Sequence, residues 1–214
     1  MTIASPLSLA RLACLGLVLT AAPTMLGHVD ADSRLTAFGH TISDYAVADL
    51  HGPVTAGMYL AAVASLALLA GLRRMRAPVT RAAAWLLASW SGFLLVAAIV
   101  PTDPLGVELT ATGYVHRYAS AAAFVSLLAA CRLMSRSLRA DARWRDLSAP
   151  VQGLTLAAAV SGLAMVATAY FGDRVLIGLA ERAMAAFAVA SLVLLALRAL
   201  KLAARPAPRF ALAV

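Results

Sequence analysis

The sequence predicts an all-α, polytopic membrane protein: a bundle of six transmembrane helices with both termini in the cytoplasm. Of its 214 residues, 62% are hydrophobic and 13% are charged, and the mean hydropathy is +0.85. Soluble domains, in contrast, are about 45–50% apolar and about 25% charged. The apolar segments also follow one another without a polar block long enough to fold separately, so we interpret residues 1–214 as a single transmembrane domain.

The number of spans follows from the lengths of the apolar runs. A spanning helix needs about 20 mostly apolar residues, because each residue rises about 1.5 Å and the hydrocarbon layer is about 30 Å thick. Runs of that length lie at about residues 9–27, 54–72, 82–100, 114–131, 151–171 and 175–197. The fourth run contains His116 and Arg117, and the sixth contains Glu181 and Arg182. These two runs therefore carry ionisable groups at membrane depth.

The first run has two interpretations. Arg11, the apolar stretch 12–19 and the small residues Ala21 and Ala22 are also typical of a secretory signal peptide. We favour a retained helix. Mass spectrometry of the mature N-terminus distinguishes the two.

The orientation follows from the charges between the runs, since short cytoplasmic loops accumulate Lys and Arg. One side carries 14 bases and two acids, and the other carries four bases and eight acids. The basic side consists of Arg11, Arg73, Arg74, Arg76, Arg81, Arg132, Arg136, Arg139, Arg143, Arg145, Arg198, Lys201, Arg205 and Arg209, with Asp141 and Asp146. We expect this side to be cytoplasmic, in a multi-pass protein of the bacterial inner membrane. The net charge of +8 therefore reports topology and not nucleic-acid binding.

Three connecting segments have their own predicted structure. In the outer loop 28–51, a hydroxyl at Thr41 three residues before Asp44 predicts a capping box and a short helix that starts at Thr41. Residues 101–104 place Asp103 between two prolines, which predicts a turn at the outer surface. On the inner side, we expect residues 134–149 to form an amphipathic segment against anionic lipid headgroups.

Ionisable side chains in a span are costly, so they usually face the bundle interior, find partners and serve a function. In the outer half of this chain, polar side chains come from four separate segments. We expect them to converge in one polar pocket beneath the outer surface. The candidates are Ser43, Asp44, His51, Asp103, His116, Arg117, Glu181 and Arg182.

Each candidate has a functional and a structural interpretation. Asp103, His116 and Glu181 are the catalytic candidates, because carboxyl and imidazole groups transfer protons. However, Asp103 also fits a turn cap, His116 an interfacial ring and Glu181 a structural ion pair with Arg117.

The remaining candidates are assigned to substrate binding. Arg117 and Arg182 suit an anionic headgroup, and Ser43, Asp44 and His51 lie in the adjoining loop. Ser43 beside Asp44 also fits a nucleophile near a base, or a simple cap. His51, His116 and Asp103 have suitable ligand types for zinc but lack a closely spaced His pair. We therefore assign no metal, and the sequence specifies no cofactor.

With these residues in view, the chain resembles the bacterial and archaeal membrane family known as domain of unknown function 998. The matching pieces are residues 41–45, the 52–72 helix with Gly57, residues 101–104, Gly113-x-x-His116 and Gly178-x-x-Glu181-Arg182. The resemblance implies a six-helix or near six-helix membrane bundle in which the outer polar residues belong together. It implies no established reaction.

Two classes of function remain, with a third behind them. The first is a membrane-embedded enzyme that acts on a lipid or lipid-linked substrate at the outer leaflet. The second is a non-catalytic binding or assembly protein with a structural polar cluster, and the third is a small transporter. We expect membrane lipids as partners and no nucleic acid, and the sequence identifies no protein partner.

Overall fold

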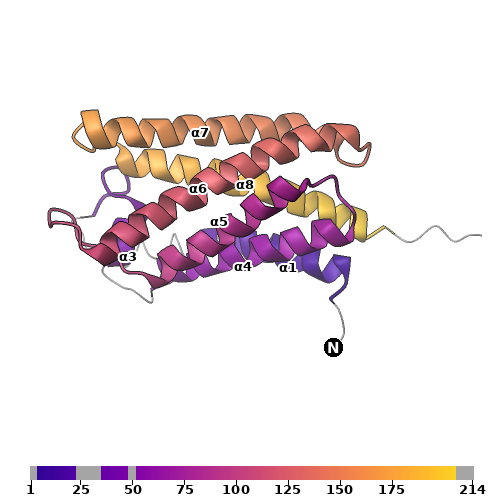
Figure 1. Ribbon diagram of the computed structural model, residues 1–214, viewed down its shortest axis with the longest axis horizontal. Coiled ribbons are helices and arrows are strands. Elements are labelled where there is room, and N and C mark those ends of the chain that lie inside the picture. Colours follow the sequence, from indigo (N-terminus) through magenta and orange to yellow (C-terminus); the bar gives the residue numbers. More distant parts are fainter. Residues whose placement is uncertain (1–3, 23–34, 48–51, 206–214) are drawn as a thin grey trace, which may run out of the picture.

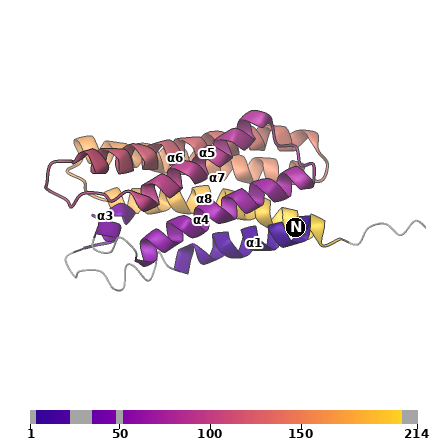
Figure 2. The ribbon, with the colours of Figure 1, turned by 60° about the horizontal axis from the view of Figure 1, so that its bottom comes forward.

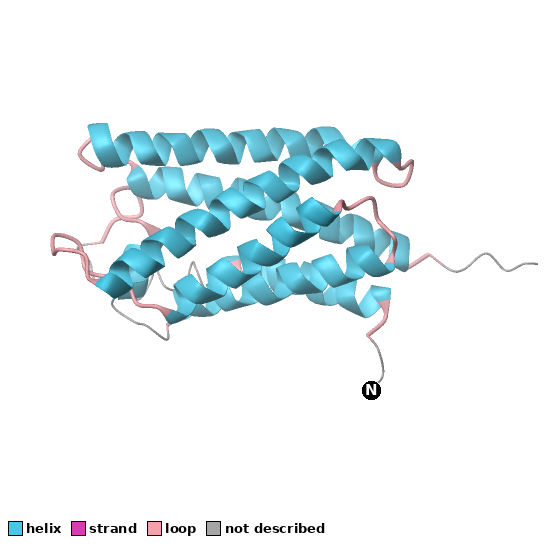
Figure 3. Ribbon diagram, in the orientation of Figure 1, coloured by secondary structure: helices cyan, strands magenta, loops and turns pink. Residues whose placement is uncertain are grey.

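The computed structural model describes residues 4–22, 35–47 and 52–205, and all regular structure in these residues is helical (Figure 3). The α-helices are α1 (Pro6–Leu19), α3 (Ile42–Val47), α4 (Pro53–Arg74), α5 (Arg81–Ile99), α6 (Ala111–Ser137), α7 (Ser148–Phe171) and α8 (Ile177–Ala203). Two short 3₁₀ turns, Leu138–Ala140 and Arg145–Leu147, join α6 to α7. The all-helical prediction is confirmed for the described residues.

Five of these helices are long and apolar enough to cross a membrane, namely α4, α5, α6, α7 and α8. The described helix α1 has 14 residues and is therefore about 21 Å long, shorter than a hydrocarbon layer of about 30 Å. The predicted first span, residues 9–27, runs on past residue 22 into a part of the chain that lies outside the described residues. Five spans are thus supported by helix length.

Helix α1 and the five long helices form a ring in chain order. Each packs against its neighbour in the sequence, and α8 packs back against α1 to close the ring (Figures 1 and 2). From α4 to α8 the connections are short, and successive helices run in opposite directions. One end of the bundle, which we call the α3 end, holds α3 and the turns 100–110 and 172–176. The opposite end, which we call the basic end, holds the start of α1, the connections 75–80 and 138–147 and the end of α8.

Threonine side chains fix the starts of two helices. Thr80 accepts a hydrogen bond from the backbone of Ala83 before α5, and Thr110 accepts one from Gly113 before α6. These are normal N-caps, which satisfy backbone donors that a helix start would otherwise leave unpaired.

The centre of the bundle is packed closely with small residues and leucines. Alanines dominate the buried positions, and Gly16 on α1 faces Ala64 on α4 so closely that an added Cβ would lie 2.7 Å from the Ala64 Cβ. Small residues let membrane helices approach at short range. The periphery is apolar instead of polar: on α7, Leu163 is 71% exposed and Phe171 is 90% exposed. This pattern fits a bundle surrounded by lipid.

In the segment 134–149, the position of Trp144 differs from the prediction. Helix α6 continues to Ser137, and Trp144 is completely buried in place of lying against headgroups. Arg139 donates hydrogen bonds to the side chains of Ser148 and Gln152, which tie the connection to α7. The apolar side of the segment therefore faces the bundle through Leu138 and Trp144, while Arg143 and Arg145 are exposed; its contact with lipid headgroups stays a prediction.

Candidate functional site at the α3 end

The short helix α3 is held by a capping box. The Thr41 backbone N–H donates to Asp44 Oδ2 at 2.7 Å, and the Asp44 N–H donates to Thr41 Oγ1 at 3.2 Å. This is the reciprocal arrangement that the sequence predicted, and helix formation at Thr41 is confirmed. The helix lies across the end of the bundle, where it contacts α4 and α8 (Figure 1).

His116 and Ser43 form a pair between α6 and α3. His116 is only 4% exposed, and its Nδ1 lies 2.8 Å from the carbonyl oxygen of Val100. Because a carbonyl oxygen can only accept, Nδ1 carries the proton and a neutral ring presents Nε2 as an acceptor. Nε2 lies 3.4 Å from Ser43 Oγ. The Ser43 hydroxyl therefore donates toward an imidazole that a second group already orients, as in a nucleophile and its base.

Glu181 approaches the same turn of α3 from α8. Its side chain is buried, and Oε2 accepts a hydrogen bond from the backbone N–H of Ile42, the residue before Ser43. The start of a helix has unpaired N–H donors and favours a negative charge. Glu181 and His116, from different helices, therefore contact consecutive residues of α3.

Arg182 binds the chain just before α3. Its Nη1 donates to the carbonyl oxygens of His40 at 2.7 Å and Gly178 at 3.0 Å. Its guanidinium carbon lies 5.2 Å from the centre of the Tyr45 ring, within cation–π range. Arg182 thus connects α8 to both ends of the segment that carries Ser43.

Gly178 allows this close approach. Its backbone N–H donates to the Phe38 carbonyl at 2.9 Å, and an added Cβ would overlap the His40 carbonyl oxygen and lie 2.6 Å from that of Ala37. A side chain at this position would push the segment off α8. The spacing Gly178-x-x-Glu181-Arg182 therefore places three residues on the surface of α8 that packs against residues 37–42.

Arg174 adds a second positive charge at this end. It lies in the turn between α7 and α8, with Nη2 3.5 Å from Asp44 Oδ2. Its side chain is 39% exposed and that of Asp44 is 11% exposed, so the pair stands at the edge of the site. Asp44 on α3 is thus paired with Arg174, while Glu181 and Arg182 contact the same segment from α8.

Asp103 serves the adjoining turn. Its Oδ2 accepts from the Thr110 backbone N–H at 2.8 Å, and Oδ1 accepts from the Thr110 hydroxyl at 3.0 Å. A Cβ on Gly113 would overlap this carboxylate, which therefore lies over the first turn of α6, one turn before His116. The turn-cap interpretation of Asp103 describes these contacts fully.

The other predicted members are placed differently. Arg117 lies on an exposed face of α6, and His51 lies outside the described residues. The structure thus brings Ser43, Asp44, His116, Glu181 and Arg182 together around α3. Within the ranges that the structure describes, there is no group of three or more His, Cys, Asp or Glu side chains that could hold a metal ion.

Sequence reasoning missed four contributors to the site. These are the side chains of Arg174 and Tyr45 and the carbonyl groups of Val100 and His40. Tyr45 belonged to the motif that ends the loop, and Arg174 was the one base in the last outer turn, so both had a signal. The carbonyl groups had none, because any residue supplies one.

Comparison with known proteins gives a family but no activity. A family model described as "Protein of unknown function (DUF998)" matches residues 14–198. No curated protein and no solved structure matches the chain.

Proposed function

The chain belongs to the family of unknown function DUF998, and we propose, from the geometry at the α3 end, that it is an enzyme embedded in the membrane that acts on lipid or lipid-linked substrates at the outer leaflet. The contact between Ser43 and His116 carries the proposal. A buried imidazole that is fixed at Nδ1 by a carbonyl and presents Nε2 to a hydroxyl is the arrangement that activates a serine.

The proposed reaction is cleavage of an ester bond. Ser43 Oγ attacks the acyl carbon while its proton passes to His116 Nε2, and the Val100 carbonyl keeps the resulting imidazolium in place through Nδ1–H. The imidazolium then gives that proton to the leaving alcohol oxygen. Water or a second alcohol, deprotonated by the same nitrogen, releases the acyl group and restores the hydroxyl of Ser43.

The other predicted residues take different roles in this proposal. His116 remains catalytic, and Ser43 moves from substrate binding to nucleophile. Glu181 and Asp103 become positioning residues, because their oxygens accept hydrogen bonds from Ile42 and Thr110. Glu181 holds the turn of α3 that carries Ser43.

The substrate class is argued from charge and location. Arg174 stands at the exposed edge of the site, and we assign it to an anionic lipid headgroup that would share it with Asp44. The site lies at one end of an apolar bundle, where a headgroup meets its acyl chains. Six crossings of the bacterial inner membrane with both termini cytoplasmic would put this end at the outer leaflet, in keeping with the predominance of acids there.

A second candidate, a non-catalytic binding or assembly protein, is favoured by one observation. Glu181 and Arg182 bind backbone groups of Ile42 and His40, so they also act as anchors that hold α3 on the bundle. In that case Ser43 and His116 would form one more anchor.

Covalent labelling separates the two candidates without knowledge of the substrate. We would treat the full chain in proteoliposomes with a lipid-tailed fluorophosphonate, which modifies activated serines, and locate the adduct by mass spectrometry. The expected adduct is on Ser43, with labelling reduced at least about 100-fold in His116→Gln. Ser161→Ala, which removes a hydroxyl bound to its own helix at Ala157, is the matched control and should label normally.

The enzyme proposal fails if Ser43 is not labelled in folded protein. Thermal unfolding in detergent supplies the check on folding. Unlabelled Ser43 together with a strongly lowered Tm of Ser43→Ala and His116→Gln would identify the pair as an anchor of α3.

A further inference from the structure

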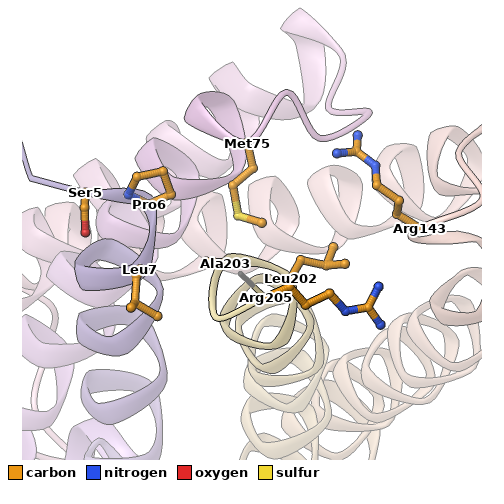
Figure 4. A pocket seen from close by; sticks show the side chains of 8 residues that line it. All are labelled: Ser5, Pro6, Leu7, Met75, Arg143, Leu202, Ala203 and Arg205. Atoms are coloured by element: carbon orange, nitrogen blue, oxygen red, sulfur yellow. The ribbon is translucent and has the colours of Figure 1, made fainter. Parts of the chain in front are cut away.

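A hollow of about 550 Å³ lies at the basic end, at the opposite end of the bundle from α3. It is bordered by the start of α1, the end of α4 and the end of α8. Figure 4 shows Leu7 and Met75 on its apolar side and the guanidinium-bearing side chains of Arg143 and Arg205 on the other, with Leu202 between them. The hollow therefore presents an apolar lining next to two guanidinium groups, of which that of Arg143 is paired with Asp141.

Arg143 is fixed in position before any ligand binds. Its Nη2 lies 2.7 Å from Asp141 Oδ2, its Nε lies 3.1 Å from Asp141 Oδ1, and Nη2 also donates to the Arg76 carbonyl at 3.3 Å. The Arg143 hydrogen bonds lower the pKa of the Asp141 carboxyl, and that carboxylate in turn raises the pKa of Arg143. Both groups therefore stay charged, and a guanidinium held in this way loses little freedom when it binds an anion.

The charges around the hollow favour an anion. Both acids in this region are already paired, Asp141 with Arg143 and Asp146 with Arg198. The bases are in excess. Those that lie at the ends of α4 and α8 and in the two connections are Arg73, Arg74, Arg76, Arg139, Arg143, Arg145, Arg198, Lys201 and Arg205.

We propose that this hollow is a binding site for an anionic phospholipid of the leaflet at the basic end. Arg143 and Arg205 bind the headgroup phosphate, since guanidinium groups match phosphate geometry. Leu7, Met75 and Leu202 contact the glycerol and the first part of an acyl chain. A soluble anion would gain nothing from these three apolar side chains, whereas a lipid covers both halves of the hollow. The proposal is independent of any reaction at Ser43.

Native mass spectrometry of the full chain, released from detergent micelles, tests this assignment. Phosphatidylglycerol is titrated, with phosphatidylcholine of the same chain length and inorganic phosphate as the comparison ligands. The wild-type protein should retain phosphatidylglycerol in preference to phosphatidylcholine. Arg143→Gln with Arg205→Gln should weaken phosphatidylglycerol binding about 10- to 30-fold, as expected for two basic groups that act on an anionic lipid.

The matched control removes the same charge outside the hollow. Arg73→Gln with Arg81→Gln changes two exposed arginines at the same end and should alter binding by less than about 2-fold. An equal loss in both double variants would overturn the proposal in favour of general surface charge.

A filling variant tests the apolar half and keeps both arginines. Met75→Trp should weaken phosphatidylglycerol binding, because the larger side chain fills the hollow. This variant still tests the proposal if the double arginine variant does not fold. Inorganic phosphate that competes as well as the lipid, together with unchanged lipid binding in Met75→Trp, would show a site for free anions and overturn the lipid assignment.

Discussion

The imidazole of His116 shows how much a single residue's role depends on its neighbours. From sequence, a histidine at the start of an apolar run fits an interfacial ring as well as a base. In the structure it is 4% exposed, with one nitrogen on the Val100 carbonyl and the other facing Ser43. It is the backbone carbonyl that gives Nε2 its acceptor role, and this carbonyl comes from the end of a different helix.

At the same scale, Gly178 gives a prediction about packing. Gly178→Ala would bring a methyl group into the His40 carbonyl oxygen, so we expect a loss of about 1–3 kcal/mol, typical of overpacking. Gly153→Ala is the control, because a Cβ there meets nothing within 4 Å; the gain in helix propensity should stabilise it by up to about 1 kcal/mol. Chemical or thermal unfolding in detergent measures both. An unchanged Gly178→Ala would mean that the segment 37–40 does not rest on α8.

Asp141 gives a prediction about pH. Hydrogen bonds from the Arg143 side chain and backbone lower its folded pKa below the ordinary value of 3.8. A lowered folded pKa means that the ionised group stabilises the fold above the unfolded pKa, and that this contribution disappears as the pH falls through the folded pKa. We therefore expect Asp141→Asn to remove part of the fall in stability below about pH 4. Near pH 7, the free energy of unfolding of the variant should be lower than that of wild type by an amount that does not change with pH. Parallel acid titrations of both proteins would contradict the pairing.

At the scale of elements, α3 depends on contacts that it cannot make by itself. A helix of six residues is too short to be stable alone, so its capping box and its contacts with Glu181 and Arg182 must supply its order. Glu181→Ala leaves the Ile42 N–H without its acceptor, whereas Glu181→Gln retains a side-chain oxygen.

Hydrogen exchange over α3 measures this dependence. A buried donor left without its acceptor costs about 1–3 kcal/mol, so amides of residues 42–47 should exchange roughly 5- to 150-fold faster in Glu181→Ala. Glu181→Gln should exchange at a rate close to wild type. Equal exchange in all three proteins would show that Glu181 does not hold α3.

The elements also show what sequence reasoning reaches. The lengths of the apolar runs predicted α4 to α8, and the Thr41 to Asp44 spacing predicted the start of α3, because both signals are local. The site was predicted in part for the same reason: Glu181 and Arg182 stood out as charges in an apolar run. Their partners did not stand out, since Ile42 and His40 contribute only backbone groups, whose placement depends on how distant segments pack.

At the scale of the whole molecule, a closed ring of six helices separates two chemically different ends. The α3 end holds the candidate nucleophile and more acids than bases, and the basic end holds the proposed lipid site with excess arginine. A ring in which each helix packs on its neighbour in the chain leaves small alanines in the centre. Each end is therefore built from connections, and a change at one end should leave the other intact.

The final prediction concerns the orientation of these two ends in the membrane. Moving arginine-rich loops across a membrane is disfavoured, so the basic end should be cytoplasmic. In a background with Cys14→Ala and Cys131→Ala, which removes two buried free thiols, a single cysteine replaces either Asp141 at the basic end or Glu108 at the α3 end.

An impermeant maleimide added to intact cells should label Glu108→Cys, which lies in the exposed turn before α6. Asp141→Cys should react only after the cells are permeabilised. Efficient labelling of Asp141→Cys in intact cells would reverse the orientation and move the Ser43–His116 pair to the inner leaflet. The proposed outer-leaflet substrate would then be wrong. The proposed serine chemistry would still be tested by fluorophosphonate labelling, because the hydrogen bonds of His116 do not depend on which side of the membrane it faces.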